Sequence, residues 1–167
     1  MTTNILAYET SSSLFVGPSK INGLGLFSRK PISSGAVVGR LSGAVLETPN
    51  KRTIQIDRQR HLCSDFIDFI NHSCRPNVYI EVASEMVLLK AINAIASESD
   101  EITIDYNCSE YSLAEPFMCR CCEKSNYIAG YRHLMETKQH NYLRCIDQFA
   151  LLHLIQMSEA GGTKSSK

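Results

Sequence analysis

One short stretch of the chain gathers most of the side chains that could do chemistry. Residues 71–77 read Asn-His-Ser-Cys-Arg-Pro-Asn and follow directly on the largely apolar residues 66–70. The apolar part should be buried, and it would carry the polar groups into or beside the core, where each needs a partner. A strand that ends in an Asn/Ser/Pro turn is the simplest explanation. The alternative is a set of amide, imidazole and thiol groups that meet partners inside the protein.

Two glycines near the N-terminus form a second candidate. Gly23 and Gly25 flank Leu24 and are followed by Leu26 and Phe27. Glycines at this spacing let the backbone turn sharply and let a ligand approach the main chain closely. A plain turn explains the same pattern. The dinucleotide-binding fingerprint is excluded, because it needs a third glycine and a following helix.

Cysteines form a third candidate. The chain has seven, and Cys119, Cys121 and Cys122 lie within four residues of one another. The N-terminus lacks the basic start and long apolar region of a signal peptide, which favours an intracellular protein, cytoplasmic or, in a eukaryote, nuclear. Cysteines in that setting are more often thiols or metal ligands than disulfides.

Composition limits the partners. The 167 residues suit one domain with a real core, and 17 basic residues balance 17 acidic ones. A broad nucleic-acid footprint needs a strongly basic face, so no nucleic acid is expected. No stretch approaches the roughly 18 apolar residues of a membrane helix, so no membrane partner is expected either.

Strands dominate the predicted elements that must position these residues. The segments 78–82 and 86–92 are rich in β-forming residues and are separated by three residues, which predicts a hairpin. Many short strands with close turns favour a mostly β domain. The other predicted strands cover residues 14–18, 36–41, 53–57 and 101–107, and residues 42–52 are predicted to be turn and loop.

The C-terminal part differs from the rest. Apolar residues from Tyr142 to Ile155 recur at three- and four-residue steps, which predicts an amphipathic helix that packs on the sheet or on a second subunit as a homodimer. The predicted organisation is a flexible N-terminus at 1–13, a main domain at 14–114, a cysteine segment at 115–134, a helix at 135–160 and a flexible tail at 161–167.

Three separated motifs together resemble the SET-domain family of protein-lysine methyltransferases. They are Gly23-x-Gly25-Leu26-Phe27, Asn71-His72-Ser73-Cys74-x-Pro76-Asn77 and Glu101-Ile102-Thr103-Ile104-Asp105-Tyr106. They occur in the family's order, and the resemblance covers residues 14–134. It implies a mostly β SET fold with short helices, in which the Asn-His-Ser stretch threads under a loop of a later strand like a knot.

The resemblance also implies a donor and a site. The methyl donor would be S-adenosylmethionine, and Tyr106 would be the catalytic tyrosine that closes the Asp-Tyr pair. A strand tyrosine with a bonded hydroxyl is the alternative for Tyr106, and a satisfied buried network is the alternative for the Asn-His pair. The residues implied to bind the donor are Gly23, Leu24, Gly25, Leu26, Asn71, His72, Tyr106 and Phe117.

The cysteine segment resembles the post-SET zinc site only in part. Cys74, Cys119 and Cys121 match three of its four zinc ligands, but Asn126 stands at the fourth position. Cys122 is too close to Cys121 to join the same ion comfortably. Losing one soft charged ligand should remove most of the affinity, so zinc is expected to be absent or substoichiometric.

One further departure concerns the substrate. Many family members line the lysine channel with a tyrosine at the position of Leu41, and the region between Gly43 and Phe66 is short here. The leading hypothesis is a methyltransferase acting on a lysine of a protein. Two alternatives stay open: methylation of a small-molecule amine or carboxyl group, and a SET fold that binds its ligands without turnover.

Overall fold

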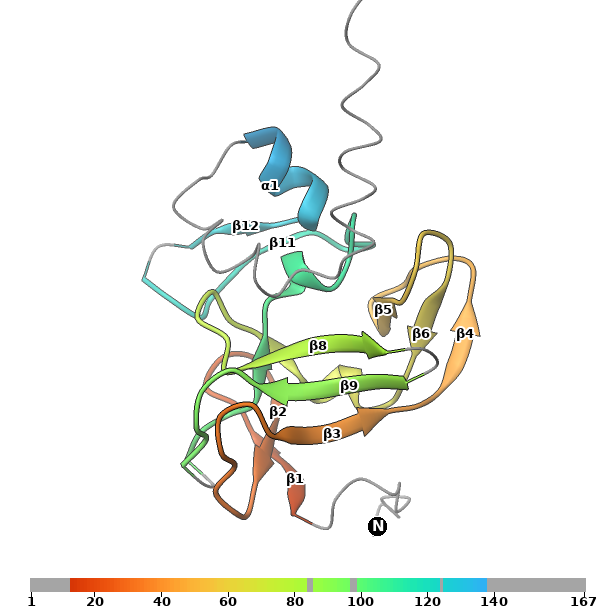
Figure 1. The fold of residues 1–167 in the computed structure, drawn as a ribbon. Coiled ribbons are helices and arrows are strands. Elements are labelled where there is room, and N and C mark those ends of the chain that lie inside the picture. The colour runs from red at the N-terminus through yellow and green to blue at the C-terminus, as the bar shows by residue number, and fades with distance from the viewer. Residues whose placement is uncertain (1–12, 84–85, 97–98, 124, 138–167) are drawn as a thin grey trace, which may run out of the picture.

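The structure, a computed structural model, describes residues 13–83, 86–96, 99–123 and 125–137. Short strands are the predominant regular elements in this part of the chain, which confirms the predicted mostly β class (Figure 1). The elements are β1 Leu14–Pro18, β2 Leu24–Ser28, β3 Val37–Leu41, β4 Ala44–Leu46, β5 Thr53–Gln55, β6 His61–Cys63, η1 Ile67–Phe69, β7 Asn71–His72, β8 Val78–Ala83, β9 Met86–Ala91, β10 Thr103–Ile104, η2 Tyr106–Cys108, β11 Phe117–Met118, β12 Tyr127–Ile128 and α1 Tyr131–Thr137.

A three-stranded sheet in the order β3-β9-β8 lies at the centre of the molecule (Figure 1). The hairpin of β8 and β9 confirms the pairing predicted from the sequence. Alternate residues of its strands are buried, as expected for β-branched and aliphatic side chains on one face of a sheet. Val78, Val87 and Leu89 are each at most 5% exposed and belong to the main core.

A second sheet in the order β4-β6-β5 lies beside the first. The prediction of turn and loop for residues 42–52 was wrong at Ala44–Leu46, which forms β4 against β6. This strand is short and largely exposed, with Val45 53% exposed, so it carries no alternating apolar pattern. Its pairing with β6, rather than its own composition, makes it a strand.

The two-glycine segment lies on a hairpin of β1 and β2. Gly23 has φ +51°, a conformation that glycine adopts without steric cost, and Gly25 pairs with Gly17 across the hairpin. Leu26 is fully buried and forms an isolated bridge to Ile102, which joins the hairpin to the segment before β10. The glycine turn is thus held beside the third motif.

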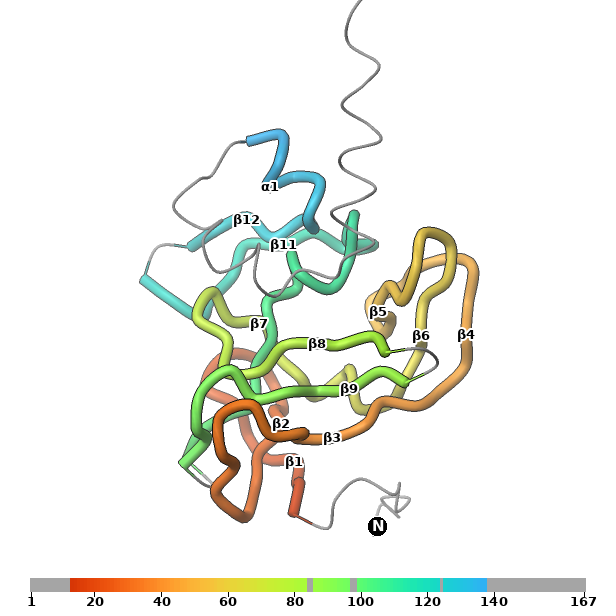
Figure 2. Tube along the Cα trace, in the orientation of Figure 1, coloured from red at the N-terminus to blue at the C-terminus, as the bar shows by residue number. Residues whose placement is uncertain are grey.

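The Asn-His stretch forms β7 and runs parallel to β10 (Figure 2). Asn77 braces this arrangement, because its Nδ2 donates to the carbonyl of Glu101 and its Oδ1 accepts from the backbone N–H of Thr103. Ser73 N–H donates to the Ile104 carbonyl and extends the pairing. The two motifs therefore lie side by side, and the knot-like threading stays a prediction consistent with that placement.

The predicted strand over residues 101–107 is shorter in the structure. Regular strand pairing covers Thr103–Ile104 only, and Tyr106 lies in the 3₁₀ turn η2 rather than on a strand. Asp105 caps this turn, since its side chain accepts a hydrogen bond from the backbone N–H of Asn107. A side-chain carboxylate that caps the backbone stabilises a turn here, although the alternation of apolar residues predicts that the strand continues.

The cysteine segment forms a small antiparallel pair, β11 with β12, followed by α1 (Figure 1). The helix predicted at 135–160 falls almost entirely on residues 138–167, outside the described residues, as do the predicted tail and nearly all of the predicted N-terminal segment 1–13. No helix within the described part of the chain has the length and apolar character needed to cross a membrane.

Candidate functional site

Asn71 ties the glycine turn to the third motif. Its side-chain nitrogen lies 2.9 Å from the Leu24 carbonyl, 3.1 Å from the Asn22 carbonyl and 2.7 Å from Oε1 of Glu101. A side-chain amide has only two N–H groups to share among these acceptors. The residue is 8% exposed, so its amide both fixes the turn and faces a small polar compartment.

Ser19 and Glu101 complete this compartment, although Ser19 lies outside the three motifs and Glu101 only begins the third. The Ser19 hydroxyl lies 2.8 Å and 2.9 Å from the two carboxylate oxygens of Glu101 and 3.1 Å from the Asn71 amide nitrogen. The backbone N–H groups of Ile21 and Asn22 donate to the same hydroxyl. Residues far apart in sequence thus contact the same turn, and no local sequence pattern predicts these contacts.

Gly25 is required by this close approach. A Cβ atom on Gly25 would overlap the Glu101 carboxylate, which is itself held by Ser19 and Asn71. Leu24 is 51% exposed, and its carbonyl is used by Asn71. Leu26 has its side chain in the core and its carbonyl bonded to Ile102, so it lies beneath the turn.

Tyr106 lies where β7 and the third motif meet. Its hydroxyl donates a 2.7 Å hydrogen bond to the carbonyl of Ile70, directly before Asn71. Burial, together with the nearby carboxylates of Asp68 and Glu101, raises the pKa of Tyr106 to about 12. The hydroxyl therefore stays protonated at neutral pH and acts as a hydrogen-bond donor.

Three rings from three segments pack together beside this hydroxyl. The ring centroids of His72 and Tyr106 are 5.5 Å apart, and the Phe117 ring lies 5.9 Å from each of them. All three pairs are edge-to-face, the arrangement that aromatic quadrupoles favour. The cysteine segment thereby joins the other two motifs through Phe117.

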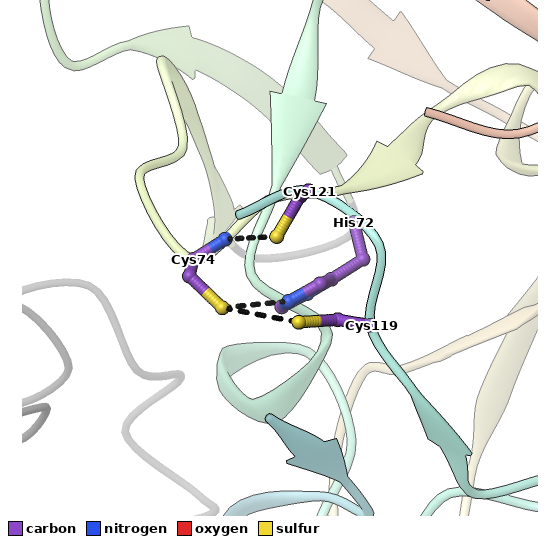
Figure 3. A group of neighbouring side chains, drawn as sticks. All are labelled: His72, Cys74, Cys119 and Cys121. Carbon is purple, nitrogen blue, oxygen red and sulfur yellow. Dashed lines mark hydrogen bonds between the residues drawn. The ribbon is translucent and has the colours of Figure 1, made fainter. Parts of the chain in front are cut away.

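His72 and three cysteines form a second, adjoining cluster (Figure 3). The ligand atoms of His72, Cys74, Cys119 and Cys121 all lie within 4.8 Å of one another, and Figure 3 shows the side chains pointing toward a common centre. The Nε2 atom of His72 lies 3.4 Å from the Cys74 sulfur, which lies 3.7 Å from the Cys119 sulfur. The structure therefore brings together the three predicted cysteines and adds His72 to them.

The environment of this cluster lowers the pKa of His72 and of Cys119, whereas burial raises the pKa of the Cys121 thiol. Burial lowers the pKa of His72 to about 4, so its imidazole is neutral at neutral pH and keeps a lone pair. Burial raises the pKa of the Cys119 thiol, but the Asn126 N–H and neighbouring thiols stabilise the thiolate more, and the pKa lies below its ordinary value. Neutral imidazole and thiolate are the forms that bind metals.

A pocket borders the polar compartment at Glu101, and a buried pair lies elsewhere in the fold. A hollow of about 300 Å³ is lined by Phe15, Phe27, Lys20 and Glu101, on the hairpin side of the glycine turn. The Nδ1 atom of His61 lies 3.2 Å from Oε2 of Glu110, and both side chains are buried. This contact ties β6 to the chain after η2.

Comparisons with known proteins give the class of this chain. The family model described as SET domain matches residues 23–107, about half of the chain. The protein belongs to the SET-domain family. The matched range contains the glycine turn, β7 and Tyr106, so the three motifs and the family match coincide.

The particular relatives are much longer proteins. Similar chains include the histone-lysine N-methyltransferase ATX2 of Arabidopsis thaliana and an H3 lysine-36-specific histone-lysine N-methyltransferase of Yarrowia lipolytica. Each is 29% identical, over 65% and 68% of this chain respectively. The chain spans only 12% and 18% of their lengths.

Solved structures agree on the fold. KRYPTONITE, in a complex with mCHG DNA and SAH, superposes with a TM-score of 0.55 at 28% identity, over 67% of this chain and 28% of that one. A second complex of KRYPTONITE, with mCHH DNA, an H3(1–15) peptide and SAH, gives a TM-score of 0.55 at 26% identity. The SET fold expected from the motifs is therefore confirmed.

Proposed function

We propose that this protein transfers a methyl group from S-adenosylmethionine to the side-chain amine of a lysine in a protein. The observation that carries the proposal is the convergence of the glycine turn, Asn71 and the Tyr106 hydroxyl. Membership of the SET family supports the reaction class. The SAH and H3 peptide in complexes of KRYPTONITE support the donor and the kind of acceptor.

The donor would be held by the chain's polar compartment. Its charged amino-acid end suits the backbone of the glycine turn together with the Asn71 amide and the Glu101 carboxylate, which lie within hydrogen-bond reach of one another. Its adenine suits the partly exposed edge of Phe117 beside His72. Gly23, Leu24 and Gly25 would contribute main-chain contacts, and Leu26 would support them from the core.

The acceptor must arrive as a neutral amine, although free lysine has a pKa of about 10.4. A narrow apolar channel disfavours the ammonium form and lowers that pKa. The lysine therefore gives up one proton to solvent first, and the new N–C bond then forms as the S–C bond breaks, which leaves a methylated ammonium and a neutral thioether. The Ile70 carbonyl and the Tyr106 oxygen would orient the polarised methyl group through weak C–H···O contacts and align the nitrogen, carbon and sulfur atoms.

Incubation with labelled donor and protein extract, followed by mass spectrometry, tests the reaction. We expect label on lysine side chains of one or a few proteins. Label found only in small molecules would show that the acceptor is a small molecule rather than a protein lysine. This alternative stays open because buried Leu41 stands where the family often has a tyrosine. Donor binding without any transfer would contradict the proposed activity and favour a binding module.

Replacing Asn71 with alanine should weaken donor binding at least tenfold. The change removes the amide that binds the Leu24 and Asn22 carbonyls and leaves Glu101 with Ser19 as a partner but without Asn71. Hydrogen bonds to charged groups contribute about 1.5–3 kcal/mol. Calorimetric titration of the donor into both proteins measures the effect.

Asn50→Ala is the matched control for this experiment. Asn50 lies in an exposed turn, where its side chain accepts from the Arg52 N–H, and its loss should leave donor affinity unchanged. Equal affinity of wild type and Asn71→Ala would contradict the assignment of the donor to this compartment.

A further inference from the structure

One His/Cys pair and one Cys/Cys pair of the same spacing meet in the fold. His72 and Cys74 flank Ser73, and Cys119 and Cys121 flank Arg120. His72 ends β7 and Cys119 directly follows β11, while Cys74 and Cys121 lie in bends, and the ligand atoms of all four residues lie within 4.8 Å of one another. Figure 3 shows the two pairs facing each other.

The distances between these atoms match a tetrahedral ion. Bonds of about 2.3 Å to sulfur and about 2.0 Å to nitrogen place ligand sulfurs about 3.8 Å apart, and nitrogen and sulfur about 3.5 Å apart. The structure has 3.7 Å between the Cys74 and Cys119 sulfurs and 3.4 Å between His72 Nε2 and the Cys74 sulfur. The widest separation in the cluster is within 4.8 Å, so a small contraction closes the tetrahedron.

Asn126 acts on this cluster as a donor rather than as a ligand. Its backbone N–H lies 3.2 Å from the Cys119 sulfur, and its side-chain Nδ2 lies 3.3 Å from the Cys74 sulfur. N–H groups that donate hydrogen bonds to ligand sulfurs orient those ligands without binding the metal themselves. Asn126 thus stands beside the tetrahedron, and the fourth position falls to His72.

We propose that the protein binds one zinc ion through His72, Cys74, Cys119 and Cys121, with the imidazole in the place of a fourth thiolate. This proposal replaces the expectation, based on Asn126 alone, that zinc is absent or substoichiometric. Three thiolates and one imidazole are a common structural zinc set, and soft ligands in a tetrahedron select zinc over magnesium or calcium. The proposal shares His72 with the proposed donor site, and its test reads the bound metal and its ligands rather than methyl transfer.

The second ring nitrogen couples this ion to the donor site. A metal on Nε2 places the ring proton on Nδ1, which lies 3.6 Å from Oδ1 of Asp105 and 3.3 Å from the Tyr106 N–H. The contact from Tyr106 N–H then gives way to donation from Nδ1 to Asp105, the carboxylate–histidine–metal arrangement. His72 is therefore a zinc ligand whose ring also borders Tyr106 and Phe117.

X-ray absorption on the full chain, purified without a histidine tag and supplied with zinc alone, tests the ligand set directly. We expect one zinc per chain with about three sulfur neighbours at about 2.3 Å and one nitrogen at about 2.0 Å. Four sulfur neighbours would overturn the proposal in favour of Cys122. Three sulfur neighbours with an oxygen instead of a nitrogen would also overturn the proposal, and so would a protein that retains no zinc.

A rescue experiment separates metal loss from misfolding. His72→Ala should lose zinc, and His72→Ala combined with Asn126→Cys should regain it, because the new thiol can reach Cys74 and Cys119. Cys122→Ser is the matched control and should keep one zinc, since that thiol is exposed and 4.0 Å from the Cys119 sulfur. Full zinc in a folded His72→Ala protein would refute the role of His72.

Discussion

Replacing Tyr106 with phenylalanine should lower kcat about a hundredfold while donor affinity changes little. The phenol donates to the Ile70 carbonyl at 2.7 Å, and these two oxygens are the ones proposed to orient the methyl group. If the hydroxyl acts mainly in the transition state, its loss appears in kcat rather than in binding. A hundredfold loss corresponds to about 2.7 kcal/mol, within the range of one well-placed polar contact in a site that excludes water.

The fold should survive this change, because the ring that packs against His72 and Phe117 remains. Turnover with a labelled peptide, donor calorimetry and a melting curve together separate the outcomes. Tyr79→Phe is the control, since Tyr79 lies in the β8–β9 hairpin opposite Lys90. Unchanged turnover in a folded Tyr106→Phe protein would show that the Tyr106 hydroxyl is not catalytic.

Gly43→Ala should destabilise the protein by about 3 kcal/mol or more. A Cβ atom at Gly43 would overlap the Cys63 carbonyl oxygen and lie 2.8 Å from its carbon and 3.2 Å from the Ser64 Cα. All three neighbours are backbone atoms of β6 and the residue after it, so no side-chain rotation relieves the overlap. Overpacking of this kind costs about 1–3 kcal/mol even where side chains can yield.

Chemical denaturation measures this loss against a matched control. Gly39→Ala lies in the neighbouring strand β3, where the nearest atom to the new Cβ is Leu14 Cδ1 at 3.5 Å, an ordinary contact. That variant should remain within about 1 kcal/mol of wild type. Equal stability of the two variants would mean that β4 and β6 separate readily at Gly43.

The sequence predicted elements well where local pattern and tertiary pairing agree. Val78–Ala83 and Met86–Ala91 combine β-forming residues with a short connection, and they form the predicted hairpin. The prediction failed at β4, where an exposed strand carries no alternating pattern. The prediction that the strand continues to residue 107 also failed. The alternation of Ile102 and Ile104 favours a strand, but the side chain of Asp105 caps a 3₁₀ turn and ends it.

The site was predictable as a set of motifs but not as a set of contacts. Asn71 and Tyr106 stand in motifs with recognisable spacing, so sequence alone placed them near one another. The partnership of Ser19 with Glu101 joins residues 82 positions apart, and no local pattern encodes it. The place of His72 beside Cys74 had one signal, a His-x-Cys spacing equal to that of Cys119 and Cys121, but the direction of its ring depends on Tyr106 and Phe117.

The parallel pairing of β7 with β10 also constrains the order of folding. Asn71 and Thr103 are partners about 30 residues apart, and the whole β8–β9 hairpin lies between them. Closing so long a loop costs chain entropy before its contacts contribute, whereas the hairpin closes locally and fast. We expect pulsed hydrogen exchange to protect the amides of β8 and β9 first and those of Ser73 and Thr103 last, so the polar compartment around Asn71 forms only as the chain completes its fold.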